Sequence, residues 1–118
     1  MGRLSTHILD VTVGKPAEGV ALELHELAED GGWRLLRQTV TNRDGRTDAP
    51  LLVGDEFRTG TYMLTFHVGP HFRKTSTEPS GRPFFDVIPL RFFVSDAEEH
   101  YHVPLLVTPW SYSTYRGS

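Results

Sequence analysis

Residues 19–27 read GVALELHEL and alternate apolar with mostly polar side chains. A strand turns successive side chains to opposite faces, so a period of two indicates a half-buried strand. Its apolar face would carry Val20, Leu22 and Leu24. The residues that follow, EDGGW at 29–33, contain two adjacent glycines of the kind that tight turns use. We therefore predict a strand that leads through a turn into a hairpin partner.

Similar patterns recur along the chain and predict an all-β protein. Further strands are expected at residues 5–11, 33–42, 60–68, 86–94, 101–107 and 111–117. Helical signal is limited to one or two turns within 71–76 and a loose turn within 49–57. Short strands separated by turn residues at this spacing are typical of a β-sandwich.

Composition limits the class of protein and its partners. The 118 residues, 38% of them hydrophobic, are enough for a single domain spanning 1–118 with its own core. The net charge is −3 and the basic residues form no run, so we expect no nucleic-acid partner. The chain has no cysteine, which excludes thiolate chemistry. We see neither a secretion signal nor a long apolar segment, so we expect no membrane association and a cytoplasmic location.

The stretch VPLLVTPWSYST, residues 103–114, contains no charged side chain. Native proteins usually protect exposed strand edges and apolar surfaces with charge. The outward half of this run therefore needs a partner, and we predict that the protein is an oligomer.

Six histidines are the first candidates for acid–base chemistry, because imidazole titrates near neutrality. His100 and His102 stand two apart in an expected strand, so both rings should point to the same face. With His7 as a third ligand they could form a zinc site that activates water. The alternative is that His100 only ends a turn in solvent. Spacing alone leaves both interpretations open.

Two arginines also allow two interpretations. Arg46 follows the Asp-Gly of an expected turn and could pair with Asp44 or Asp48 on the surface. It could instead project over a pocket and hold a planar, anionic ligand through its forked donors. Arg116 offers the same choice near the end of the chain. From the residues alone we expect a small oligomeric β-sandwich with a possible His/Arg pocket.

Three motifs carry a resemblance to a known family. STHILD at 5–10, TNRDGR at 41–46 and HYHVPLLVTPWSYSTYRGS at 100–118 together resemble the 5-hydroxyisourate hydrolases, the transthyretin-related enzymes of urate breakdown. The ending YRGS distinguishes this family from transthyretin itself, the hormone carrier of the same fold. The resemblance covers essentially the whole chain. It implies an all-β, transthyretin (prealbumin)-like β-sandwich of two four-stranded sheets with one short helix.

The resemblance also implies a site, a reaction and an assembly. His7, Arg46 and His102 would line the active site as catalytic residues, with Arg46 also binding substrate. The terminal motif would complete the pocket through Tyr115, Arg116, Gly117 and Ser118. The reaction would hydrolyse the ring amide of 5-hydroxyisourate to a ureidoimidazoline, without cofactor or metal. The family's homotetramer, a dimer of dimers, would place the sites in the channel between dimers.

Roles follow from the tasks of such a hydrolysis. His7 and His102 would share the base and acid roles, in an order that the sequence does not assign. Arg46 would bind the substrate edge and offset developing negative charge. Ser118 would either position water or substrate or simply pack at the strand end. The rival interpretations are a transthyretin-type carrier of a small aromatic ligand, a metal-dependent hydrolase using His7, His100 and His102, and a purely structural sandwich.

Overall fold

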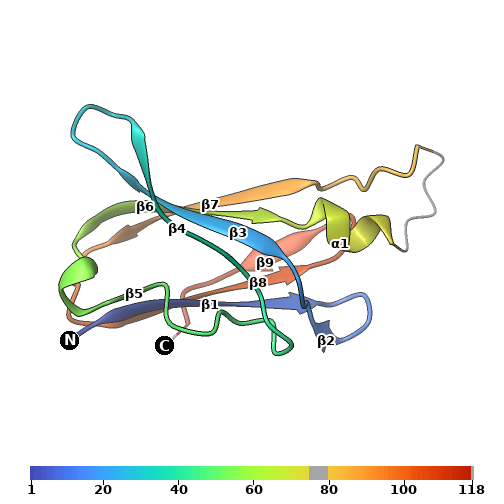
Figure 1. Ribbon diagram of the computed structural model, residues 1–118, viewed down its shortest axis with the longest axis horizontal. Coiled ribbons are helices and arrows are strands. Elements are labelled where there is room, and N and C mark those ends of the chain that lie inside the picture. The colour runs from blue at the N-terminus through green and yellow to red at the C-terminus, as the bar shows by residue number, and fades with distance from the viewer. Residues whose placement is uncertain (75–79, 118) are drawn as a thin grey trace.

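A computed structural model describes residues 1–74 and 80–117 and shows two β-sheets packed face to face (Figure 1). One sheet has the order β4 (Trp33–Val40), β3 (Ala21–Leu27), β6 (Gly60–His67) and β7 (Val87–Val94). The other has the order β2 (Lys15–Pro16), β1 (Arg3–Asp10), β8 (His100–Val107) and β9 (Tyr112–Thr114), with β5 (Leu52–Val53) also paired to β1. The predicted all-β sandwich is confirmed, and β5 adds a fifth strand to one sheet. The strands β2 and β5 were not predicted, because two residues are too few to show alternating apolar and polar side chains.

The helical segments are short. Helix α1 (Gly69–Arg73) starts two residues before the predicted segment 71–76, because Pro70 occupies its first turn, where a missing N–H costs no bond. Part of that predicted segment lies outside the described residues. The loose turn expected within 49–57 is the 3₁₀ helix η1 (Gly54–Glu56), which follows β5. Among the described residues no helix is long and apolar enough to cross a membrane.

The alternation in β3 produces the burial that the sequence predicts. Val20, Leu22 and Leu24 are at most 1% exposed and pack in one core with residues of both sheets. Leu4 and Ile8 of β1 are fully buried in the same core. Burying such a side chain stabilises the fold by about 1.5–3 kcal/mol. From Leu4 to Ile8, buried side chains alternate with partly exposed ones. The odd-numbered side chains of β1 therefore lie on the outer face of its sheet.

The pairing of β1 with β8 places the two ends of the sequence side by side. This pair is parallel, whereas the other strand pairs among the described residues are antiparallel. Ser5 lies opposite His102, and His7 lies opposite Pro104. The outer face of β1 and β8 therefore carries side chains from both the first and the last motif of the chain.

Three other histidines lie elsewhere in the fold, and two of them contact carboxylates. The Nε2 atom of His71 lies 2.8 Å from a carboxylate oxygen of Asp10 and so connects α1 to the end of β1. The Nε2 atom of His67 lies 3.0 Å from a carboxylate oxygen of Glu23 on the other sheet. His25 is half-buried on that sheet rather than solvated as its position in an alternating strand suggests. These three imidazoles do not belong to the face formed by β1 and β8.

Candidate active site

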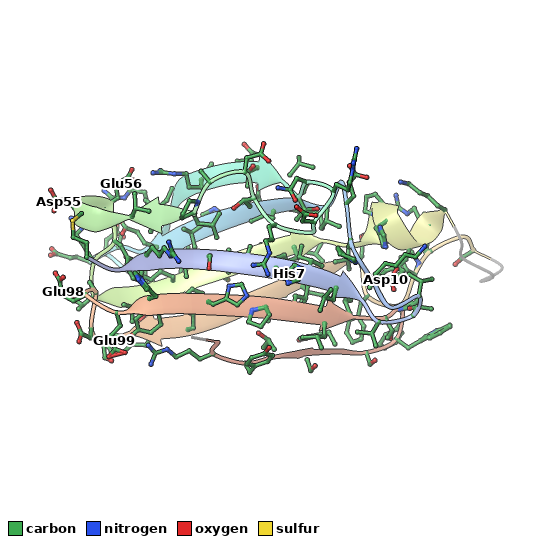
Figure 2. The ribbon with its side chains drawn as sticks, turned by 90° about the horizontal axis from the view of Figure 1, so that it is seen from below. His7, Asp10, Asp55, Glu56, Glu98 and Glu99 are labelled. Atoms are coloured by element: carbon green, nitrogen blue, oxygen red, sulfur yellow. The ribbon has the colours of Figure 1, made fainter. Side chains whose placement is uncertain are left out.

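His7 and His102 approach each other on the outer face of the β1–β8 pair. Their ring centroids are 6.5 Å apart, and the rings are tilted by 37°. Figure 2 shows His7 on β1, where the strand runs beside β8. Both side chains are half-buried. The sequence motifs at the two ends of the chain thus supply one imidazole each to a common site.

The turn after β4 brings Arg46 to the same place. The side-chain oxygen of Asn42 accepts hydrogen bonds from the backbone N–H groups of Asp44 and Arg46, at 2.9 and 3.2 Å. Gly45 has φ +73°, a conformation that other residues rarely adopt, and a side chain there would collide with the carbonyl oxygen of Ile8. The Ile8 N–H donates to the Gly45 carbonyl at 2.8 Å. Turn and strand are therefore in backbone contact, and Arg46 pairs with His7 as an isolated bridge.

The guanidinium of Arg46 is exposed and takes part in no ion pair among the described residues. The surface pairing with Asp44 or Asp48 that the sequence allowed is absent from this part of the chain. Asp48 instead accepts a hydrogen bond from the Asn42 side chain at 3.0 Å. Arg46 thus keeps its donors available for a ligand.

Two adjoining hollows lie beside these groups. One, of about 280 Å³, is lined by Arg3, Ser5, Arg46, His100, Tyr101 and His102. The other, of about 200 Å³, shares Arg3, Ser5 and Arg46 and extends along residues 47–50. We call the two hollows together the β1 trough. His7 lies at its side rather than in its lining. The trough is polar and rich in cationic groups, unlike the mostly apolar pockets that bind drug-like ligands.

Burial and charge both act on the imidazoles. The pKa of His102 is lowered from its ordinary 6.5 by burial, then by the positive charge of Arg46 and by His7. The pKa of His7 is lowered by burial and by Arg46, while contacts with Asp44 act in the opposite direction. Both rings are therefore largely neutral at neutral pH. A neutral imidazole can accept a proton from water, which is the property that a general base needs.

The terminal segment crosses His102. After the short strand β9 the backbone N–H of Gly117 donates to the carbonyl oxygen of His102 at 2.6 Å. A Cβ atom at position 117 would lie 3.0 Å from Cδ2 of the imidazole, so only glycine passes the ring without displacing it. Gly117 therefore lies at the site that the sequence motifs predicted. Ser118, the last residue of that motif, lies outside the described residues.

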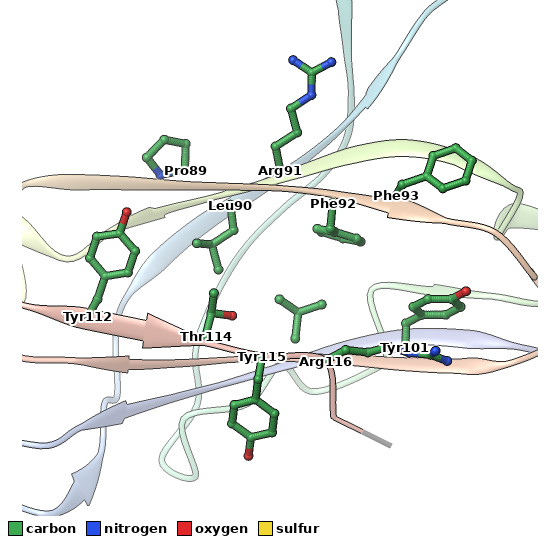
Figure 3. Close-up of a pocket in the computed structure, with 11 residues that line it drawn as sticks. Pro89, Leu90, Arg91, Phe92, Phe93, Tyr101, Tyr112, Thr114, Tyr115 and Arg116 are labelled. Carbon is green, nitrogen blue, oxygen red and sulfur yellow. The ribbon is translucent and has the colours of Figure 1, made fainter.

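Tyr115 and Arg116 point to opposite sides of the terminal segment: Arg116 faces away from the imidazoles, whereas Tyr115 points away from the space between the sheets, toward the outer face that carries His102 (Figure 3). The Tyr115 side chain is 61% exposed. The Arg116 guanidinium lies 4.0 Å from the ring centroid of Tyr101 and donates to Glu99 at 2.7 Å. The structure thus gives Arg116 a contact within the chain, on the opposite side of the terminal strand from His102. Direct substrate contact by Tyr115 and Arg116 stays a prediction.

No group of three or more metal-ligating side chains gathers within residues 1–74 and 80–117. His100 lies opposite Arg3 in the β1–β8 register, one full repeat away from His102 along the strand. The third ligand of the zinc alternative, His7, lies beyond His102 on the neighbouring strand. In the described part of the chain the three histidines do not form a common ligand set.

Ser5 is the site residue that the sequence analysis missed. Its Oγ atom lies 2.8 Å from Nδ1 of His102. The sequence does indicate that Ser5 lies on the same face of β1 as His7, because the two residues are two positions apart in a strand. Its partner could not be inferred, because that requires the parallel register between β1 and β8.

A second cavity, of about 440 Å³, opens between the edges of the two sheets (Figure 3). Leu90 and Phe92 of β7 point into it, and Thr114 of β9 faces them from the other sheet. β7 and β9 are the last strands of their sheets, and each has an edge without a partner strand within the described residues. This region lies on the far side of the terminal segment from the β1 trough.

Comparison with known proteins places the chain in a family. The model of the HIUase/Transthyretin family matches residues 4–117. The chain is 50% identical to "5-hydroxyisourate hydrolase 2" of Rhizobium meliloti (strain 1021) over 117 residues, 99% of this chain and 97% of that protein. Its structure resembles (S)-allantoin synthase, with a TM-score of 0.90 and 49% identity over 99% of this chain but only 44% of the other. It also resembles sea bream transthyretin in complex with thyroxine, with a TM-score of 0.87 and 29% identity over 98% of this chain and 94% of the other. The chain belongs to the HIUase/Transthyretin family.

Proposed function

We propose that this protein hydrolyses 5-hydroxyisourate by adding water to its ring amide. The observation that carries the proposal is the convergence of His7, Arg46 and His102 on one face, with the imidazole centroids 6.5 Å apart. The named activity of the 50% identical Rhizobium protein supports it. A carrier of the transthyretin type would favour an apolar site, whereas the β1 trough presents imidazole and guanidinium groups.

The two imidazoles supply proton transfer in this mechanism. One neutral ring takes a proton from the attacking water and becomes an imidazolium. The pair then delivers that proton to the departing ring nitrogen, so both rings end neutral. With their centroids 6.5 Å apart, both rings are within reach of one bound substrate. Positioned proton transfer of this kind contributes about 10²–10⁴-fold to a rate. No nucleophilic side chain is required, so the mechanism proceeds without a covalent intermediate.

Arg46 supplies binding and charge stabilisation. Its planar guanidinium presents paired N–H donors that match the carbonyl and ring-nitrogen edge of the substrate. As water adds to the amide carbonyl, negative charge develops on the oxygen, and a donor held beside it lowers the barrier. The backbone contacts of the 42–46 turn hold that donor in place. Gly117 and Ser118 of the terminal segment would close the site on the His102 side.

The activity test uses freshly made substrate. 5-Hydroxyisourate is generated from urate by urate oxidase, and its absorbance decay is followed with and without the purified protein. We expect the protein to accelerate the decay, and we expect the same rate after treatment with a chelator. Decay at the spontaneous rate would contradict the proposed activity, and loss of activity on chelation would favour the metal-dependent alternative.

We also propose that the protein assembles as a homotetramer, a dimer of dimers. The edge strands β7 and β9 carry exposed aromatic side chains, including Phe93 at 64% and Tyr112 at 40%. Trp110, in the uncharged run 103–114, is 61% exposed in the single chain. Exposed apolar edges of this kind favour pairing with another copy. A tetramer would bury these side chains and enclose the β1 trough between subunits.

Light scattering coupled to size exclusion tests the assembly. We expect a mass four times the 13.3 kDa of the chain at micromolar concentration. A dimer would support the edge pairing but not the second interface. A stable monomer would contradict the proposal and would leave the uncharged run unexplained.

A further inference from the structure

The imidazole of His102 has a neighbour beside each of the two ring atoms nearest the backbone. Nδ1 lies 2.8 Å from the Ser5 hydroxyl, and on the opposite side of the ring a Cβ atom at Gly117 would lie 3.0 Å from Cδ2, so Gly117 adjoins that side. Both atoms adjoin the carbon that joins the ring to the side chain, so Nε2 is at the distal end. Nε2 has no hydrogen-bond partner among the described residues. The two neighbours therefore leave Nε2 as the nitrogen that can meet water or substrate.

The position of Ser5 follows from the fold. Ser5 and His102 lie directly opposite each other in the parallel β1–β8 pair, although they are 97 positions apart in the sequence. Ser5 is half-buried, and it lines both hollows of the β1 trough. Its contact with His102 is thus set by the backbone ladder between two strands rather than by a loop.

We propose that Ser5 is a positioning residue of this site, whose hydroxyl keeps Nδ1 of His102 hydrogen-bonded in each protonation state while Nε2 exchanges protons. A hydroxyl both donates and accepts. It donates to Nδ1 when the neutral ring carries its proton on Nε2. It accepts from Nδ1–H when the ring is the other tautomer or the imidazolium. This inference rests on the proposed hydrolase function and adds a residue to it.

The choice of a hydroxyl matters because of the charges around His102. Within the described residues, the titratable or charged groups near this ring are Arg3 and His7 of β1, Arg46 of the turn, and His100 and Tyr101 of β8. Arg116 of the terminal segment turns instead to Glu99. A carboxylate at position 5 would stabilise the imidazolium and raise the pKa of His102. The neutral hydroxyl satisfies Nδ1 without that effect, so His102 stays available as a base.

Three substitutions separate positioning from packing. Ser5→Thr keeps the hydroxyl, Ser5→Ala removes it, and Ser5→Asp replaces it by a carboxylate. We expect Ser5→Thr to retain kcat within about threefold and Ser5→Ala to lower kcat about tenfold with little change in KM. Tenfold corresponds to one hydrogen bond of typical net strength. Ser80→Ala removes an exposed serine hydroxyl outside the trough, which accepts a hydrogen bond from the backbone N–H of Arg82, and should leave kcat unchanged.

The pH profile and ring resonances provide the readouts that a structural role would not change. In Ser5→Asp the pKa of His102 should rise, so kcat/KM should be lost at a higher pH than in the wild type. The ¹⁵N resonances of the His102 ring should report the same rise, and in Ser5→Ala they should report an altered tautomer balance. Ser5→Thr should preserve both the profile and the resonances.

The two proposals fail in different ways. If the wild type does not accelerate 5-hydroxyisourate decay, the function is wrong, while the ring resonances of the Ser5 variants still report on positioning. If the wild type is active but Ser5→Ala matches it in kcat, pH profile and ring resonances, the positioning role is wrong. Equal loss of activity in Ser5→Thr and Ser5→Ala would also overturn it, because the hydroxyl would then not be the group that matters.

Discussion

Replacing His102 with alanine should lower kcat by about 10²–10⁴-fold, the usual contribution of a positioned acid or base. The ring is half-buried at the surface trough and lies outside the apolar core, so the variant should remain folded. Steady-state assays with fresh 5-hydroxyisourate measure the effect, and thermal unfolding checks the fold.

The matched control for this variant is His67→Ala. It removes an imidazole of similar exposure on the other sheet, where Glu23 is its partner. We expect wild-type kcat for this control. Similar losses in both variants would indicate a general effect of histidine removal, and wild-type kcat in His102→Ala would contradict the proposed mechanism.

Substitutions of Arg46 should separate the charge of the guanidinium from its geometry. Arg46→Lys keeps a positive charge but loses the planar fork, so kcat/KM should fall by about 10²–10³-fold, as when one transition-state donor is removed. Arg46→Gln loses the charge as well. Because Arg46 lowers the pKa of both His7 and His102, its loss should raise both pKa values.

The pH profile distinguishes the two Arg46 variants. The base must be neutral, so kcat/KM declines as the pH falls through the pKa of the imidazole. In the wild type that pKa lies below 6.5. We expect the decline to move to higher pH in Arg46→Gln and to stay near the wild-type position in Arg46→Lys.

Arg43 offers a matched control in the same turn, because its side chain is exposed and it is not part of the trough lining. Arg43→Gln should retain wild-type kcat/KM and pH dependence. An equal shift of the pH profile in Arg43→Gln and Arg46→Gln would mean that general surface charge, rather than Arg46, lowers the pKa values. Wild-type turnover in Arg46→Lys would count against a role for the planar fork.

The strands of the two sheets were largely predictable because their signals are local. Alternation marked β3 and β6, and the glycine-containing turns marked the ends of the hairpins. The last strand shows the limit of this method. Residues 111–117 were predicted as one strand, whereas β9 covers Tyr112–Thr114 and Gly117 pairs separately with His102. Between them, Arg116 contacts Tyr101 and Glu99, which no local pattern reveals.

The candidate site was predictable through its motifs rather than through its geometry. Resemblance identified His7, Arg46 and His102, and the structure brings them together. The same motif also named Arg116, whose guanidinium the structure directs away from the imidazoles. A motif records which residues occur together, but it does not record the direction in which each side chain points.

The sequence by itself determined the all-β class, the faces of the main strands and the turn that carries Arg46, because each of these depends on neighbouring residues. Only the tertiary structure decided that β1 runs parallel to β8, and with it that Ser5 and His7 meet His102. The physical reason is that a parallel pairing between distant segments is chosen by the burial of whole sheets in a common core. Which strands pair in parallel therefore depends on the packing of the whole chain, and no single stretch of residues indicates it.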